Sequence, residues 1–285
     1  MSDLLDHALK EKYNSMKIND PLTFVKNAID WDAFTPLLSD LYHNDTDNGG
    51  RPNIRVKTMI KVLFLQSMFN MVDEQAETLI KDRISFMNFL DFADQYPDAR
   101  TIWLFRERLS RTGRNRIIWN ELQRQLESKN IRVKKGSAQD ATFITSDPGH
   151  VRHDEPRSDG RTRRSKDRSF TKKNNKTFFG YKGHTIVYDN IPVPVYRDKG
   201  YFGHDLKGID GTMDRTVRNH KLSIESIRRN LRISRKRSLV EYPYAIIKRM
   251  FHFSHVMVTT VKRVRVKFMF ACFAYNVHAL KIING

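Results

Sequence analysis

Three acidic residues stand where regular elements could present their side chains for chemistry. Asp140 lies in an expected strand (GSAQDATFI), Asp198 closes another (VYRDKGYFG), and Glu241 opens an expected helix (RSLVEYPYAIIK). Three convergent carboxylates would supply the hard oxygen ligands that a pair of Mg²⁺ or Mn²⁺ ions needs, leaving positions for water and phosphate. Because the chain contains 32 acidic residues, spacing alone favours ordinary surface or ion-paired acids.

Strand and helix patterns alternate in the half of the chain that carries these acids. In the segment around Asp140, side chains 140 and 142 share one face of the expected strand, and 141 and 143 share the other. Two prolines, Pro192 and Pro194, weaken the third expected strand. The pattern predicts an α+β (α/β-like) fold. The expected strands span 138–144, 181–188 and 191–198, and the expected helices span 224–233, 241–251 and 262–283.

The N-terminal half differs in both pattern and charge. Residues 1–50 are polar and end in the turn-rich HNDTDNGG, which is typical of a linker. Residues 51–130 carry apolar residues at helical spacing and predict a helical domain. The remaining residues, 131–285, would then form the catalytic domain.

The positive charge is concentrated in the second part of the chain. The net charge is +19 overall, −5 over residues 1–100 and +24 over residues 101–285. Such an excess indicates a polyanionic partner, with nucleic acid as the default, although a generally basic surface without a special partner is the alternative. The segment 156–176, which includes Arg163 and Arg164, is expected to be a mobile basic loop that is either a solvated linker or a nucleic-acid contact.

Several classes of protein are disfavoured by composition. The single cysteine, Cys272, excludes an intramolecular disulfide framework and a cysteine-based zinc site, and the histidines show no standard zinc spacing. The polar, acidic N-terminus predicts no signal peptide. The apolar stretch Phe268–Tyr275 is too short to cross a bilayer, so we expect a cytoplasmic protein without a membrane partner.

Further motifs link the three acids to a known family. DATFI contains Asp140, GYKGH spans 180–184, and RDKGYFG contains Asp198. Arg237, Glu241 and Lys248 follow at fixed spacing, and upstream lie GRPNIRVKTMIKVLFLQSMFN, DRISFMNFLDF and PDARTIWLFRERL. In order and number, these segments resemble the DDE transposases of bacterial and archaeal insertion sequences over residues 50–285.

The resemblance implies a helical N-terminal domain followed by a ribonuclease H-like catalytic domain with a mixed sheet, which we expect to be incomplete. Asp140, Asp198 and Glu241 would be the catalytic, metal-binding triad for two ions. The substrate would be double-stranded DNA, at the element ends and at the target, and a homodimer and a prokaryotic, nucleoid-associated location are expected by resemblance alone. The tyrosine of the family signature is absent, because Ser234 occupies its position. The residues expected to contact DNA are Arg237, Lys248, Lys182, Lys199, Arg163 and Arg164; His184 could join them or be structural.

One departure from the family pattern concerns the short segment YDNIPVPVYRD between His184 and Asp198. The family places a strand and a helix there. We expect the crossover from the GYKGH strand to the other side of the Asp140 strand to need a dozen or more residues, usually with a helix. Either the Asp198 strand pairs with the GYKGH strand, away from Asp140, or it reaches its usual place with an unpaired connection. We expect an internal deletion and a copy that binds DNA but cleaves it poorly. The alternatives to an active transposase are a catalytically defective DNA-binding remnant and, less favoured, an RNA-binding protein, because no aromatic platform is evident.

Overall fold

The described part of the chain forms two compact units. The computed structural model describes residues 2–16, 19–42, 52–129, 137–146, 167–173, 175–187, 195–203, 209–216 and 220–284. One unit comprises Met1–Lys129 together with Val258–Gly285, and the other comprises Asn130–Met257. We refer to them as the helical unit and the sheet unit. The predicted α+β class with a mixed sheet is confirmed.

Local sequence signals set the ends of several helices in the helical unit. The Asp98 side chain caps α7 by accepting a hydrogen bond from Thr101 N at 2.7 Å, and Gly113 ends this helix with a φ of 70°. Asn70 ends α4 in the same left-handed conformation. The helices are α1 (Ser2–Ser15), α2 (Pro21–Ala28), α3 (Phe34–Leu37), η1 (Ser39–Leu41), α4 (Val56–Phe69), α5 (Asp73–Asp82), α6 (Ile84–Phe89), α7 (Ala99–Thr112), α8 (Asn115–Ser128) and α10 (Val261–Asn284).

The first fifty residues are not the polar linker that their composition predicts. They contain α1 to α3, and Leu22, Val25 and Trp31 are each at most 3% exposed. Their apolar residues occur at spacings that bring them to one side of short helices, where they pack into the core. The HNDTDNGG stretch lies outside the described residues.

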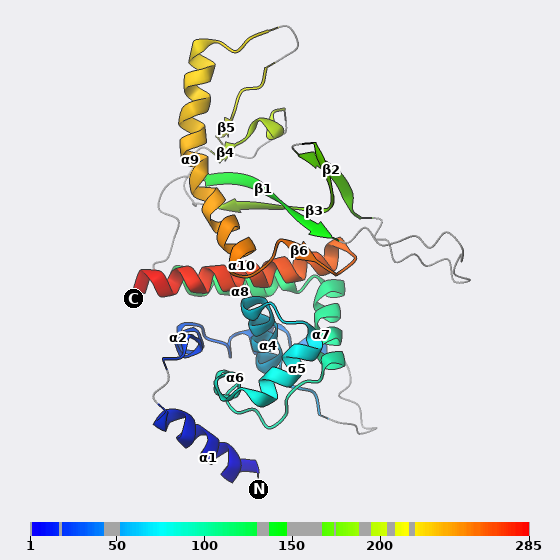
Figure 1. Cartoon of the computed structure of the whole chain (residues 1–285). Helices are drawn as coiled ribbons and strands as arrows, with labels where there is room; N and C mark the ends of the chain where they lie inside the picture. The colour runs from blue at the N-terminus through cyan, green and yellow to red at the C-terminus, as the bar shows by residue number, and fades with distance from the viewer. Residues whose placement is uncertain are drawn as a thin grey trace, which may run out of the picture. The chain divides into compact units, whose positions relative to one another are not determined.

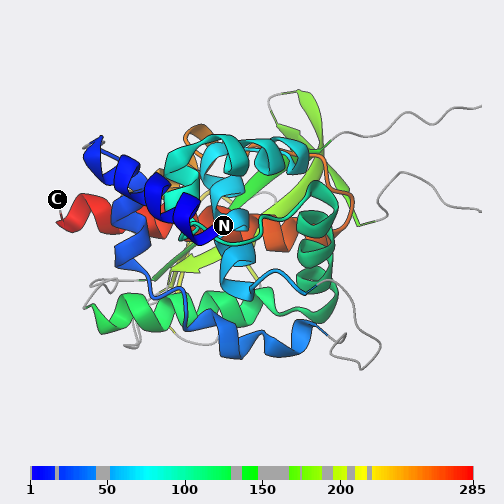
Figure 2. The ribbon, with the colours of Figure 1, turned by 90° about the horizontal axis from the view of Figure 1, so that it is seen from below.

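The helical unit is completed by α10 from the far end of the chain. This helix packs against α4, α7 and α8, and Figure 2 shows it, coloured orange to red, lying across the other helices of the unit. Phe273 is fully buried, and its ring stacks on Trp31 with centroids 5.7 Å apart. The structure therefore differs from the expected 131–285 domain, because the apolar face of α10 is buried by N-terminal helices.

The length of α10 also bears on the expected absence of a membrane partner. Residues Val261–Ile283 are long and apolar enough to cross a bilayer, which the stretch Phe268–Tyr275 alone is not. Half of the apolar window is buried within the protein, however, as in a core helix. Length and composition are thus weak evidence for a membrane span.

A buried lysine links α4 to the turn after α6. Lys61 is 1% exposed, and its Nζ donates to Phe89 O at 2.8 Å and to Asp91 Oδ2 at 2.7 Å. Burial lowers the pKa of Lys61 to about 8. Burial opposes ionisation of Asp91 too, but hydrogen bonds from Lys61 and Lys26 outweigh it and lower the pKa of this carboxyl to about 2. Both groups of the pair are therefore charged at neutral pH.

Replacing Lys61 with alanine is expected to lower the free energy of unfolding of the helical unit by about 2 kcal/mol, because Phe89 O loses a buried charged donor. Lys57→Ala is the matched control. Lys57 also reaches Asp91, at 3.3 Å, but its side chain is 28% exposed, and we expect a loss below about 1 kcal/mol. Urea denaturation of both variants measures the difference, and equal losses would contradict the role of burial.

The sheet unit is built around β1, which carries Asp140. The strand order is β2-β3-β1-β4-β5, and β6 also pairs with β1. β3 runs antiparallel to β1, whereas β4 runs parallel to it on the other side. The elements are β1 (Ser137–Ser146), β2 (Ser169–Lys173), β3 (Lys176–Val187), β4 (Val195–Arg197), η2 (Lys199–Tyr201), β5 (Asp210–Thr212), α9 (Ile224–Arg249) and β6 (His255–Val256).

Part of the segment expected to be a basic loop forms a strand. β2 lies within 156–176 and pairs antiparallel with β3 along its whole length. Phe170 faces Phe179 across the pair, and such a cross-strand aromatic pair stabilises the hairpin despite the basic composition of the segment. Arg163 and Arg164 lie outside the described residues.

The short segment before Asp198 does not prevent β4 from reaching β1. In the observed register, Val187 lies opposite Ala138, and Val195 lies opposite Ser137. Because β3 is antiparallel to β1, β3 ends beside the start of β1, and β4 begins beside that same start. The connection 188–194 must span only two strand spacings, about 10 Å, whereas seven residues can reach about 23 Å. The predicted obstacle was wrong, because a long crossover is needed only between parallel strands.

Candidate active site

A single long helix, α9, packs against the two strands that lead to Asp140 and Asp198. Figure 1 shows α9 running beside the sheet, and it contacts both β1 and β4. Two separate helices were expected, with Glu241 at the start of the second. Instead Glu241 lies inside a 26-residue helix, although Pro243 is also inside it. The prediction failed because burial of apolar residues on both sides of the proline favours a continuous helix over local propensity.

The inner face of α9 is fixed by both apolar packing and polar contacts. Ile233 and Ile247 are at most 4% exposed, and they lie on the buried stripe of the helix. Lys236 Nζ donates to the hydroxyl of Tyr196 at 2.9 Å, and its ammonium lies 4.9 Å from the centre of the same ring. The middle of α9 is thereby held over β4.

The register of the parallel pair brings the positions of two candidate acids side by side. Ala138 of β1 lies opposite Tyr196 of β4. Asp140 lies two residues further along β1, and Asp198 lies two residues after Tyr196, directly beyond the end of β4. If the register continued past the observed pairs, the two positions would lie opposite each other. The alternative in which the Asp198 strand pairs with the GYKGH strand is wrong, because β4 pairs with β1 and β5.

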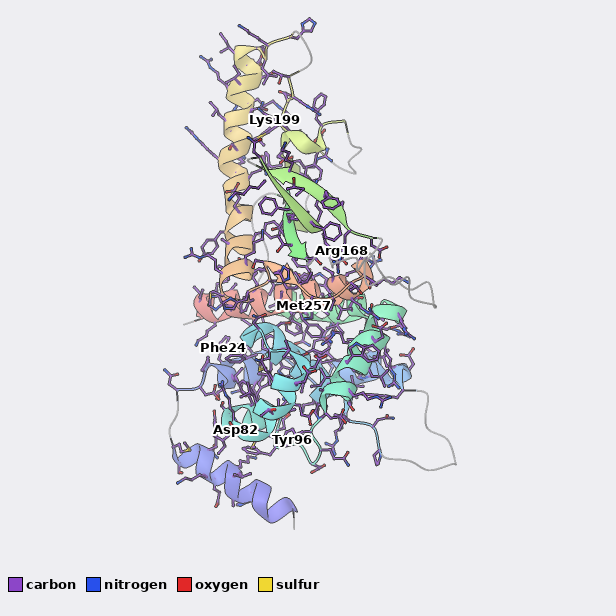
Figure 3. The ribbon with its side chains drawn as sticks, turned by 45° about the vertical axis from the view of Figure 1, so that its right-hand side comes forward. Phe24, Asp82, Tyr96, Arg168, Lys199 and Met257 are labelled. Carbon is purple, nitrogen blue, oxygen red and sulfur yellow. The ribbon has the colours of Figure 1, made fainter. Side chains whose placement is uncertain are left out.

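Asp198 sits directly after β4 with its carboxylate held in place. Oδ1 accepts a hydrogen bond from Gly200 N at 2.7 Å, and this bond caps η2. Oδ2 lies 3.9 Å from the guanidinium of Arg237 on α9, at the outer limit of an ion pair. The Asp198 side chain is 43% exposed, so one side of the carboxylate remains accessible to a ligand. Lys199, labelled in Figure 3, is exposed beside it.

Carboxylate oxygens suit a hard divalent cation, but the described side chains do not include all three acids gathered at one point. Among the side chains that the structure describes, no group of three acidic, histidine or cysteine residues is close enough to hold a metal. The side chain of Asp140 is outside that set. Glu241 is exposed on α9, one helical turn, about 6 Å, beyond Arg237. The observed elements therefore place two acids on adjacent strands and the third on the helix that covers them.

The expected basic residues are distributed over different parts of the sheet unit. Lys248 is half-buried on α9, two turns after Glu241. Lys182 lies opposite Phe143 and thus on the sheet face away from Thr142 and Asp198. The structure does not bring Lys182 to the candidate site. The side chain of His184 is not described.

Sequence reasoning missed a buried arginine that fixes the end of β4. Arg197 is 2% exposed; its Nε donates to Thr212 Oγ1 at 2.7 Å and its Nη2 donates to Asp210 Oδ1 at 3.1 Å. Its guanidinium also lies 5.9 Å from the ring centre of Tyr201 in η2. These contacts join β4, β5 and η2, and so position Asp198. The available signal was an arginine directly before the acid that closes the expected strand.

Comparison with known proteins relates the chain to transposases through its helical unit. Residues 10–108 match the model of a family described as a transposase domain (DUF772). This segment is about a third of the chain and lies within the helical unit. No solved structure matches the chain. At this level, the match supports a transposase-related, DNA-processing protein.

Proposed function

We propose that the chain is a DDE-type transposase whose sheet unit is a ribonuclease H-like catalytic domain. The observation that supports the proposal is the parallel pairing of β1 with β4, because the strand that carries Asp140 then neighbours the strand that leads to Asp198, and α9, which bears Glu241, packs against both. The strand order, antiparallel on one side of β1 and parallel on the other, agrees with this fold. Cleavage and joining of DNA strands would be phosphoryl transfer by in-line displacement.

In this proposal, Asp140, Asp198 and Glu241 hold two Mg²⁺ or Mn²⁺ ions. When bound, the ions would activate the attacking oxygen and stabilise the leaving one. Arg237 and Lys248 would hold the phosphates of double-stranded DNA, at the element ends and then at the target. A homodimer on paired ends, a cytoplasmic, nucleoid-associated location and the absence of a membrane partner belong to the same proposal.

The outer face of α9 supports a polyanionic substrate. Three exposed arginines at spacings of three and four residues share one face of its N-terminal half. Backbone phosphates of DNA are the complementary charge, and such contacts position a duplex without reading its sequence. The arginines are Arg228, Arg232 and Arg235.

A second candidate is a DNA-binding remnant of such an enzyme. The Asp198 carboxylate is already engaged by Gly200 N and faces Arg237, and both contacts compete with a metal. An internal deletion before Asp198 belongs to this candidate, although the short segment still lets β4 pair with β1. Both candidates share DNA binding and differ only in cleavage.

Cleavage by the whole protein separates the two. A plasmid that carries the DNA ends flanking the coding sequence is incubated with Mg²⁺, Mn²⁺, Ca²⁺ or EDTA. We expect nicking and strand transfer with Mg²⁺ and Mn²⁺ only, because Ca²⁺ has looser coordination geometry. DNA binding without cleavage in every metal would support the remnant, and cleavage that persists in EDTA would refute the metal mechanism.

A further inference from the structure

A strip of aromatic and basic side chains lies on one face of the β2–β3 hairpin. Arg168, Phe170 and Lys172 stand at every second position of an extended segment and therefore share a face. Phe170 pairs with Phe179 across the strands, and their ring centroids are 4.7 Å apart. Figure 3 labels Arg168 at this end of the sheet. We call these four residues the hairpin strip.

The strip combines a fixed cation with an accessible ring. The Arg168 guanidinium lies 5.5 Å from the ring centres of both Phe179 and Tyr181, and its Nε donates to the Tyr181 hydroxyl at 3.0 Å. These contacts hold the charge beside the aromatic face. Phe170 is 68% exposed, so most of its ring is open to solvent.

The strip shares its sheet face with the candidate active site. Tyr181 lies opposite Ile144 in the register of β3 with β1, so Phe179 and Phe170 are on the face of Ile144. The parallel pairing of Ala138 with Tyr196 sets Asp198 on that same face. Between the two, α9 packs against β1 and β4, so the strip is a separate surface on the same side of the sheet.

The charge on the hairpin favours a nucleic acid over a second copy of the chain. β2 is last in the strand order, where it could in principle pair with another edge strand. Lys172 and Lys176 are exposed on the hairpin, and edge lysines oppose such pairing. Aromatic rings flanked by cations are instead the means by which proteins bind unpaired bases.

We propose that the hairpin strip binds unpaired nucleobases of single-stranded DNA. One base stacks on the ring of Phe170, and Arg168 and Lys172 hold the neighbouring phosphates. The choice of DNA rests on the proposed function, since stacking alone does not distinguish DNA from RNA. In that setting, the strip would retain a strand that has separated from the duplex near the cleavage site.

The test uses the full chain and fluorescently labelled oligonucleotides of mixed sequence, in EDTA so that cleavage plays no part. Phe170→Leu keeps an apolar side chain but removes the aromatic face, whereas Phe170→Trp restores it. We expect Phe170→Leu to weaken single-stranded DNA binding by about 5- to 100-fold, with less than a twofold change for duplex DNA. Phe170→Trp should restore affinity, and its added tryptophan fluorescence should be quenched by single-stranded DNA.

Four results would overturn the inference: unchanged affinity of Phe170→Leu for single strands, an equal loss for single strands and duplex, tighter binding of single-stranded RNA than of DNA, or loss of self-association in Phe170→Leu. The last would identify the hairpin as an interface between copies. Because binding is measured without metal, a failure here is distinct from failure of the proposed cleavage.

Discussion

Replacing Asp198 with asparagine is expected to lower metal-dependent DNA cleavage about a thousandfold or more. An amide is a much weaker ligand for a hard cation than a carboxylate, and losing about 4 kcal/mol of transition-state stabilisation corresponds to that factor. The amide oxygen can still accept the hydrogen bond from Gly200 N, so the turn after β4 should persist. DNA affinity should be unchanged or higher, because a negative charge is removed.

Asp214→Asn is the matched control. Asp214 also follows a strand of the sheet unit, and its Oδ1 accepts a hydrogen bond from Arg229 of α9 at 3.0 Å, much as Asp198 faces Arg237. Its loss should change the cleavage rate by less than about threefold, because it is outside the proposed triad. Cleavage rates are measured under single turnover, with affinity followed separately. Equal losses in both variants would indicate a structural role for the carboxylates and not metal binding.

Local patterns predicted the elements that carry the candidate site better than their connections. The alternation around Asp140 identified β1, and Thr142, on the face predicted to include position 140, is 6% exposed. The sequence could not reveal that β3 ends at the same end of the sheet at which β4 starts, because this depends on the direction in which β3 pairs with β1. Without that knowledge, the short connection suggested that Asp198 was displaced from Asp140.

Long-range packing explains the other differences. Two helices were expected over 224–233 and 241–251, whereas burial of Tyr244 and Ile247 beyond Pro243 favours one continuous helix. The unit to which α10 belongs was likewise not predictable, because an apolar helix pattern does not show which other helices will bury it. The triad itself remains a proposal: sequence resemblance selects it, and strand register supports two of its members.

The junction of α10 with the N-terminal helices gives the largest expected effect on stability. Phe273→Ala should lower the free energy of unfolding of the helical unit by about 3–5 kcal/mol, because a fully buried aromatic ring leaves a cavity. The ring stacks on Trp31 at 5.7 Å and meets Phe64 edge-on at 5.3 Å, so the cavity would open at the centre of this core. Ile282→Ala is the control, because Ile282 lies on the same helix but is 62% exposed. It should change the free energy of unfolding by less than about 0.5 kcal/mol.

Hydrogen exchange shows where the loss falls. If residues from both ends of the chain form one cooperative unit, Phe273→Ala should weaken amide protection in α2, α4 and α8 together with α10. Protection in β1 and β3 should stay within experimental error, because these strands belong to the sheet unit. Faster exchange confined to α10 would mean that this helix frays alone, and that the N-terminal helices form a core without it.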